Sequence, residues 1–368
     1  MIGALTLKEL ILSASRITGI TAAVRNSSWR RSRLAILCYH GVSLRDEHEA
    51  APALYMSPAT FRRRLEILRH SGFNVLSLTD ALSRLSSGHL PPRSVALTFD
   101  DGTRDFAEVT VPLLQEFSMP ATVYLTTYYC EKRLPVFDTA VRYLLWRGRA
   151  RPLEFRYFGH PGLNVPLADQ ESRSIASARI IKSAKERHLT ANDKHLLLRQ
   201  ISIDLGIDFE EFLATGMFTI MAPDQVAALP RGLVDVQLHT HRHRTPRDLT
   251  SFRKEIVDNQ VSLNKVTVNA NTELQHFCYP SGDYSGEFLN WLPSLGIRSA
   301  TTCIPGLATR NGNPLLLPRF VDTGATTESI FDSWISGTAE LLPRRRRHKL
   351  DHSRLNVASL GSSAEACL

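Results

Sequence analysis

Two adjacent carboxylates stand at the end of an apolar run in the first third of the chain. Residues 95–99 are largely apolar and are followed by Asp100, Asp101 and Gly102. Such a run predicts a buried strand, and α/β folds place their chemistry at the carboxyl ends of strands. Neighbouring strand residues point to opposite faces, but a bend at Gly102 would turn both acids into one pocket. One acid could then hold a metal while the other accepts a proton. The alternative is a solvent-exposed turn.

A second group of polar residues follows a later apolar run. Residues 234–238 predict another strand, and His239, His241 and His243 come directly after it. The four-residue spacing of His239 and His243 lets two imidazoles converge on one cation. Together with one carboxylate they would form a two-histidine, one-carboxylate metal site with open positions. A metal in such a site lowers the pKa of a bound water, and a second carboxylate can act as the general base.

The elements that must position these residues alternate along the chain. Apolar runs predict strands at residues 34–41, 73–78, 95–102, 121–125, 234–238, 277–279, 299–302 and 315–320. Helical patterns separate them, at residues 57–68, 79–85, 106–117, 223–229 and 249–266. This alternation predicts a parallel sheet or barrel. Residues 130–220 interrupt it with mostly helical segments, so we expect an insertion there that either forms a wall of the site or is a structural cap.

The composition excludes several classes of protein. Five cysteines are scattered without metal-type spacing, and their odd number argues for reduced thiols over a disulfide framework. The net charge of +8 comes from the two ends of the chain. The basic run 344–349 follows a proline and has no interleaved aromatics, which favours a solvated tail over a nucleic-acid site. We therefore expect no nucleic-acid partner. No feature of the sequence defines an oligomeric state.

Residues 5–24 predict an amphipathic helix followed by a basic cluster up to Arg33. Ser13, Ser15 and Arg16 make its apolar stretch too polar to span a membrane, and a cleavable signal with a basic start is not evident. One interpretation is a helix that packs on the following domain, with the basic cluster as a solvated linker. The other is peripheral contact with the anionic inner leaflet of a membrane. We expect a cytoplasmic protein, membrane-associated under the second interpretation.

The two strand-end groups carry a family resemblance. The chain resembles the bacterial polysaccharide deacetylases with NodB homology in Thr98-Phe99-Asp100-Asp101-Gly102 and in His239-Thr240-x-x-His243. Further matches are Tyr39-His40-Gly41-Val42, residues 57–61 and 72–78, Tyr279-Pro280-Ser281-Gly282 and Leu317-Pro318-Arg319. The resemblance covers residues 34–125 and 220–322. It implies an α/β fold, a distorted (β/α) barrel over residues 34–338 with a mostly helical insertion at about 130–220. A basic helix and linker (1–33) and a basic, disordered tail (339–368) would flank the barrel.

The resemblance also implies roles for individual residues. Asp100 would be the general base, and Asp101, His239 and His243 would hold a divalent metal. Zinc is expected, although Co²⁺ or Fe²⁺ would suit the same ligands. The metal and the backbone N–H of Ser281 would stabilise the oxyanion. Tyr279, in the same motif, is expected to bind substrate.

The sequence departs from the family pattern in two places. Cys278 stands where many members carry an arginine that orients the base, so Arg319 is the candidate to reach in from a later strand. Cys278 itself is expected to be a small packed residue. The late catalytic histidine of the family has no clear match. We therefore consider His40, at the end of the first strand, as the general acid that protonates the leaving amine, against a structural histidine bonded to backbone. His241 is expected to be solvated or to lie behind the ligands, and Asp235 to be structural.

These residues favour a hydrolase of carbon–nitrogen bonds other than peptide bonds. It would remove N-acetyl groups from amino sugars of a bacterial polysaccharide or its lipid-linked precursor, as in exopolysaccharide biosynthesis, with an N-acetylated glycan as its partner. One alternative is hydrolysis of another amide, such as an imide or formamide. The other is a non-catalytic glycan-binding or scaffold protein whose site has decayed. Metal content distinguishes an enzyme from a scaffold, and product analysis distinguishes sugar acetamides from other amides.

Overall fold

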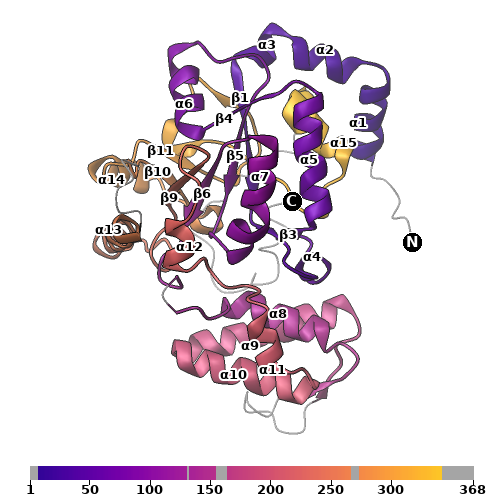
Figure 1. The fold of residues 1–368 in the computed structure, drawn as a ribbon, viewed down its shortest axis with the longest axis vertical. Helices are drawn as coiled ribbons and strands as arrows, with labels where there is room; N and C mark the ends of the chain where they lie inside the picture. Colours follow the sequence, from indigo (N-terminus) through magenta and orange to yellow (C-terminus); the bar gives the residue numbers. More distant parts are fainter. Residues whose placement is uncertain (1–6, 131, 155–163, 267–272, 342–368) are drawn as a thin grey trace.

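A curled, mainly parallel sheet forms the centre of the computed structural model, which describes residues 7–130, 132–154, 164–266 and 273–341 (Figure 1). Its hydrogen-bonded order is β11-β10-β9-β6-β5-β1, with β12 antiparallel on β1, β13 parallel to β1 and β4 parallel to β5. The strands span Arg33–Tyr39 (β1), Asn74–Leu76 (β4), Ser94–Phe99 (β5), Ala121–Leu125 (β6), Val234–Leu238 (β9), His276–Cys278 (β10), Ser299–Thr301 (β11), Ala308–Thr309 (β12) and Phe320–Val321 (β13). Every residue of β5 and β6 is buried, because helices cover parallel strands on the outside. The expected α/β barrel is confirmed as a curled half-barrel.

One short segment links the two edges of this sheet. Leu317 forms a parallel bridge with Thr301 of β11, and Phe320 of β13 pairs with Leu37 of β1. The sequence predicted one strand over residues 315–320, and this prediction is wrong. A 3₁₀ turn (Pro314–Leu316) comes first, and the strand begins only at Phe320, since Pro318 has no N–H to donate. Residues 317–321 thus bridge the two edges of the curled sheet.

Helices surround the sheet in the predicted alternation. They are α5 (Pro58–His70), α6 (Leu78–Ser87), α7 (Val111–Phe117), α12 (Pro223–Ala227), α13 (Leu249–Val266), α14 (Phe288–Ser294) and α15 (Glu328–Ser336). A π-helical turn (Phe106–Thr110) precedes α7, and 3₁₀ turns span Pro280–Gly282 and Thr338–Leu341. Ser57 caps α5, because its hydroxyl accepts from the N–H of Thr60. Ser77 caps α6 in the same way, because its hydroxyl accepts from the N–H of Asp80.

The insertion is a helical lobe with a core of its own (pink in Figure 1). It contains α8 (Phe137–Arg147), β7 (Leu153–Glu154), β8 (Asn164–Val165), α9 (Gln170–Glu186), α10 (Ala191–Leu205) and α11 (Phe209–Ala214). It leaves the barrel after β6 and returns where Ile220 pairs with Thr103, just beyond the end of β5. A separate two-stranded sheet, β2 (Gly41–Val42) with β3 (Tyr55–Met56), and the short α4 (Glu47–Ala50) complete this end of the molecule. The lobe is thus attached at the carboxyl ends of the strands.

The N-terminal region differs from the single helix and linker that the sequence predicted. Gly19, with φ 79°, separates α1 (Leu7–Ile17) from α2 (Ile20–Asn26), and a third helix, α3, spans Ser28–Arg31. These helices pack on α15, and Arg16 lies 3.8 Å from Asp332. Arg30 is fully buried and donates to the carbonyl oxygens of Ile335 and Ser94, so this part of the basic cluster is a structural anchor and not a solvated linker.

The opposite side of α1 and the start of α2 leave apolar side chains in solvent, at Leu10, Ile11, Ile17 and Ile20. Among the described residues, none of the helices combines the length and the hydropathy that crossing a bilayer requires. The basic run 344–349, and with it nearly all of the predicted tail 339–368, lies outside the described residues.

Candidate active site

The two predicted strand-end groups meet at one edge of the sheet. β5 ends at Phe99, directly before Asp100, and β9 ends at Leu238, directly before His239. β6 lies between these strands and runs parallel to both. Because all three strands end at the same side, the carboxylates and the histidines converge there.

Left-handed backbone turns the second carboxylate away from the strand. Asp101 has φ 67° and Gly102 has φ 74°. The Gly102 N–H donates to the carbonyl oxygen of Asp100 at 2.8 Å, and a Cβ at Gly102 would collide with the side chain of Leu125. Left-handed conformation costs a non-glycine residue about 1–2 kcal/mol, and such residues cluster at functional sites. The bend that the sequence placed at Gly102 thus begins at Asp101, which lets the two acids face different partners.

Asp101, His239 and His243 form a set of donors suited to a metal ion. Nε2 of His239 and Nε2 of His243 lie 3.3 Å and 3.1 Å from the same oxygen, Oδ1 of Asp101. Nδ1 of His239 lies 2.9 Å from the carbonyl oxygen of Cys278, which requires that Nδ1 carry a proton and turns Nε2 toward Asp101. A neutral Nε2 and a carboxylate oxygen both offer lone pairs, so their approach is favourable when a positive charge lies between them, either a metal ion or a proton carried by Nε2. The donor set therefore fits a divalent metal.

The electrostatics of these residues also favour positive charge at this point. Burial lowers the pKa of His239, but Asp101 and Asp100 outweigh it and the pKa lies above its ordinary value. Burial raises the pKa of Asp101, but the imidazoles of His243 and His239 outweigh it and hold this pKa well below its ordinary value. The two carboxylates thus favour positive charge at His239, which a proton or a divalent cation can supply.

Two polar residues of α13 hold the histidine loop, and sequence reasoning missed both. Asn259 accepts the N–H of His239 at 3.0 Å and donates to the carbonyl oxygen of Leu125. Glu255 accepts the N–H of Arg242 at 2.8 Å. Glu255 and Asn259 are fully buried and lie four residues apart, on the face of α13 that packs on the sheet. Polar residues at core-facing positions of an amphipathic helix were the signal that could have found them.

Asp100 has a different partner from its neighbour. Its Oδ1 and Oδ2 lie 2.7 Å from Nη1 and Nη2 of Arg319, a bidentate pair in which both side chains are almost fully buried. Burial alone would raise the pKa of Asp100, but Arg319 outweighs burial and the pKa lies below its ordinary value. The guanidinium is held in turn by Nε, which donates to the carbonyl oxygen of Thr302. The structure thus brings the candidate replacement arginine onto the candidate base, and its role in catalysis stays a prediction.

Two buried thiols lie against the same carboxylate. Sγ of Cys38 and Sγ of Cys278 are 3.4 Å and 3.3 Å from Oδ2 of Asp100. Burial raises the pKa of both thiols well above the ordinary value, so they are neutral donors. Sγ of Cys278 is also 3.2 Å from Nη2 of Arg319. Cys278 is therefore a small packed residue, as predicted, and it adjoins the space that Arg319 occupies.

His40 follows β1 and lies beside the base. One ring nitrogen of His40, a carboxylate oxygen of Asp100 and Sγ of Cys38 are within 4.8 Å of one another. Its Nδ1 is buried and has no hydrogen-bond partner among the described residues. The structural alternative, a ring tied to the backbone through this nitrogen, does not fit this observation.

Ser281 and Tyr279 occupy different environments despite their shared motif. Ser281 is exposed and has φ 56°, within the 3₁₀ turn that follows β10. The Tyr279 side chain is fully buried, and its hydroxyl donates to the carbonyl oxygen of Leu315 at 3.0 Å. The phenol is thus part of the core, so contact of Tyr279 with a substrate would have to involve its backbone.

The two residues expected to be accessory have structural partners. Nδ1 of His241 is 2.9 Å from Oγ1 of Thr127, so this ring lies behind the donor set. Asp235 accepts from the side-chain amide of Gln237, and burial raises the pKa of Asp235 to about 6.

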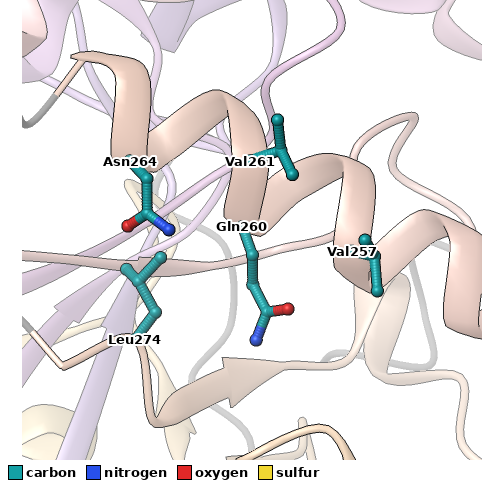
Figure 2. Close-up of a pocket in the computed structure, with 5 residues that line it drawn as sticks. All are labelled: Val257, Gln260, Val261, Asn264 and Leu274. Carbon is teal, nitrogen blue, oxygen red and sulfur yellow. The ribbon is translucent and has the colours of Figure 1, made fainter.

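A hollow of about 410 Å³ elsewhere on the surface is distinct from this site (Figure 2). Val257, Gln260, Val261 and Asn264 of α13 line it together with Leu274. Leu274 precedes β10, whereas the donor set lies at the other end of that strand. None of the residues that line the hollow belongs to the site described above.

Comparisons with known proteins agree with this geometry. The family model "Polysaccharide deacetylase" matches residues 87–154 and 204–300, which include both strand-end motifs and leave out the middle of the insertion. Poly-beta-1,6-N-acetyl-D-glucosamine N-deacetylase of Escherichia coli is 32% identical over 118 residues, which are 30% of this chain and 17% of that protein. The chain thus spans less than a fifth of the curated relatives that it matches.

Solved structures share the fold at low identity. Deacetylase PplD of Streptococcus pyogenes, in complex with acetate, has a TM-score of 0.54 and 19% identity over 82% of this chain and 98% of its own. BC0361, a polysaccharide deacetylase of Bacillus cereus, has a TM-score of 0.51 and 17% identity over 82% of this chain and 69% of its own. IcaB of Ammonifex degensii has a TM-score of 0.50 and 17% identity over 83% and 97%. Fold and site define a half-barrel with a histidine–carboxylate centre. The family match covers just under half of the chain, so these comparisons show that the chain is similar to polysaccharide deacetylases and shares their fold.

Proposed function

We propose that this chain is a metal-dependent hydrolase that removes N-acetyl groups from amino sugars of a bacterial polysaccharide or its lipid-linked precursor. The observation that carries the proposal is the convergence of Asp101, His239 and His243 beside the arginine-paired Asp100. A divalent metal, which we expect to be zinc, would polarise the acetamide carbonyl and lower the pKa of water at this point. The match to the polysaccharide deacetylase family model supports the choice of substrate.

Asp100 is the proposed general base, and its contacts indicate which oxygen accepts the proton. Oδ2 already receives Arg319 and two thiols, whereas Oδ1 receives only Nη1 of Arg319 among the described residues. Each carboxylate oxygen has two lone pairs, so Oδ1 keeps one for the water. Arg319 keeps Asp100 ionised and fixes the plane of its carboxylate. Asp100 is therefore able to accept a proton, but its lowered pKa makes it a weak base. Such a base suits a water that is itself unusually acidic.

His40 is the proposed donor of the proton that the leaving amine requires. His40→Gln keeps a polar side chain and is expected to lower kcat on an N-acetylated sugar about 100-fold. Hydrolysis of p-nitrophenyl acetate should fall far less, because its phenolate leaves without protonation. Equal loss on amide and ester would exclude His40 as the general acid and assign it a structural role.

The backbone N–H of Ser281 is the proposed second contact to the oxyanion. This N–H forms no backbone hydrogen bond among the described residues, and its left-handed residue is held within a turn. Removal of one such donor typically costs about 100-fold in kcat. The experiment is a backbone ester at position 281, made by semisynthesis, and unchanged kcat would contradict this role.

Metal content is the first test of the proposed function. The purified chain should hold about one zinc-like ion, and His239→Ala and Asp101→Ala should lose it together with acetate release from N-acetylglucosamine oligomers. His241→Ala is the matched control, since it removes an imidazole of the same loop that lies behind the donor set. A parent chain that takes up neither zinc, cobalt nor iron would refute the mechanism and favour a glycan-binding role. Acetate release from other amides, with none from sugars, would favour the alternative hydrolase.

We also propose that the chain acts in the cytoplasm and contacts the inner leaflet through α1 and α2. Leu10, Ile11, Ile17 and Ile20 are 45–86% exposed on these helices, a larger apolar surface than isolated exposed residues form. Sedimentation with anionic liposomes tests this contact. Ile17→Ser with Ile20→Ser should weaken it, whereas Leu249→Ser, an exposed apolar residue on α13, should not. A parent chain that does not sediment with anionic liposomes at physiological salt would refute the proposed membrane contact.

A further inference from the structure

A pocket of about 170 Å³ lies between the loop after β6 and the insertion lobe. Tyr128 and Tyr129 contribute two rings whose centroids are 5.1 Å apart at 89°, so they form a corner. Phe137, at the start of α8, adds a third ring. Flat aromatic faces bind the C–H faces of sugar rings, and tyrosine adds a polar group at its edge. The shape and the rings of this pocket suit one sugar residue.

The polar groups of the pocket carry one sign of charge. Lys132 and Lys194 line it together with His195, and none of its described lining residues is acidic. Neither lysine has a carboxylate within ion-pair distance in the described part of the chain. Nδ1 of His195 is buried and has no partner among the same residues. Asp193, next to Lys194 in the sequence, instead accepts from Thr190 in the capping box of α10. Cations without an ion-pair partner next to apolar rings favour an anionic group on the bound sugar.

The pocket adjoins the candidate metal site. The Tyr128 N–H donates to the carbonyl oxygen of His241 at 2.8 Å, which ties one wall of the pocket to the loop between His239 and His243. Asp138, in the first turn of α8, interacts electrostatically with both Lys194 and His243. A glycan with its acetamide at the donor set can therefore place a neighbouring residue in the pocket. The lobe would then form one wall of the site, the role the sequence left open.

We infer that this pocket is a subsite for an acidic sugar residue, one that carries a carboxylate or a phosphate next to the N-acetylated residue. The inference rests on the proposed function, since it names the class of glycan that the same site accepts. The tyrosines would hold the ring, and Lys194 and Lys132 the anion. The chain would thus prefer anionic N-acetylated glycans to neutral ones of the same length.

Binding measured by calorimetry tests the inference without turnover. The probes are three oligosaccharides of equal length: neutral N-acetylglucosamine, N-acetylglucosamine alternating with glucuronate, and a 6-phosphorylated N-acetylglucosamine oligomer. Nζ of Lys194 lies 5.5 Å from the centre of the Phe137 ring. Lys194→Met keeps an unbranched aliphatic side chain and removes the charge, and Lys194→Arg restores the charge. Lys182→Met is the matched control, because Lys182 is an exposed lysine of the same lobe that does not line the pocket.

The expected pattern separates charge from ring contacts. Lys194→Met should weaken binding of an acidic oligomer about fivefold to tenfold, and Lys194→Arg and Lys182→Met should bind as the parent does. Tyr128→Ala should weaken neutral and acidic oligomers alike. The glucuronate and phosphate probes show which anion is preferred.

Equal affinity of the parent for neutral and acidic oligomers, or equal loss in Lys194→Met and Lys182→Met, would overturn the inference. Acetate release is followed in parallel. An unchanged rate of acetate release from the acidic oligomers in Lys194→Met would overturn the inference and leave the proposed function intact. Binding with this pattern but no acetate release from any oligomer would refute the hydrolase and support the subsite.

Discussion

Replacing Arg319 by lysine tests whether this residue positions the base or only holds the barrel together. The guanidinium makes two contacts of 2.7 Å to Asp100 and one of 3.0 Å to the carbonyl oxygen of Thr302. A single ammonium can replace one contact to the carboxylate but not the planar pair. A hydrogen bond to a charged group contributes about 1.5–3 kcal/mol. Loss of one in the transition state therefore predicts a fall in kcat of about 10-fold to 100-fold.

The assay measures kcat and KM for acetate release together with the free energy of unfolding in urea. Arg64 provides a matched control, because it forms the chain's other almost fully buried arginine–aspartate pair among the described residues. Its Nε lies 2.9 Å from Oδ2 of Asp322. Both Arg319→Lys and Arg64→Lys should lower the free energy of unfolding by about 2–4 kcal/mol, since each leaves a buried carboxylate short of a donor. Only Arg319→Lys should lower kcat, with KM little changed.

The outcome that would refute this reasoning is a matched loss of stability with kcat within about twofold of the parent. Arg319 would then be a structural residue, and Asp100 would need no orientation by a guanidinium. A rise in KM with unchanged kcat would instead move Arg319 from the base to substrate binding.

Two further predictions concern residues around the site. Asn259→Ala removes the acceptor for the His239 N–H and should weaken zinc binding about 10-fold, measured by competition with a chromogenic chelator. Gln260→Ala is the control, because the Gln260 amide donates to the carbonyl oxygen of Leu295 and zinc affinity should not change. Equal zinc affinity of Asn259→Ala and the parent would contradict the role of Asn259. Burial raises the pKa of Asp105 to about 7, above the ordinary value of 3.8, so its stabilising contribution is complete below about pH 4 and is lost as the pH rises through 7. At pH 7 the free energy of unfolding of Asp105→Asn, measured in urea, should therefore exceed that of the parent by roughly 1–4 kcal/mol. At pH 4 the two free energies should be equal. A gap that does not change with pH would contradict the raised pKa.

The positions of the candidate ligands could be predicted because they depend on local pattern. An apolar run that ends in polar residues marks the end of a buried strand, and parallel strands end at one edge. Asp100, Asp101, His239 and His243 were therefore found from the sequence, and the structure brings them together. The order of the two acids could not be predicted in this way. It depends on the left-handed backbone at Asp101, which non-glycine residues rarely adopt.

What the sequence pattern missed depends on long-range packing. Glu255 and Asn259 have ordinary helical surroundings, and only the docking of α13 on the sheet makes them buried partners of the histidine loop. Arg30 belongs to a cluster of arginines that predicts solvent exposure, yet it is buried because carbonyl oxygens of two distant segments meet it. The pairing of Arg319 with Asp100 joins residues 219 apart, so the sequence could offer it only as a hypothesis.

That separation has a consequence for the order in which the protein becomes competent. Asp100 lies in the first third of the chain, and its guanidinium partner is synthesised near the end, on the segment 317–321 that bridges the two edges of the sheet. A nascent chain that has emerged only as far as β11 contains the base and all three candidate ligands but not the arginine. Under the proposed function, a chain in which this segment has not docked would lack the guanidinium that orients its base. Activity per molecule toward a glycan would then rise as chains close, and it would report the fraction of chains in which Arg319 has reached Asp100.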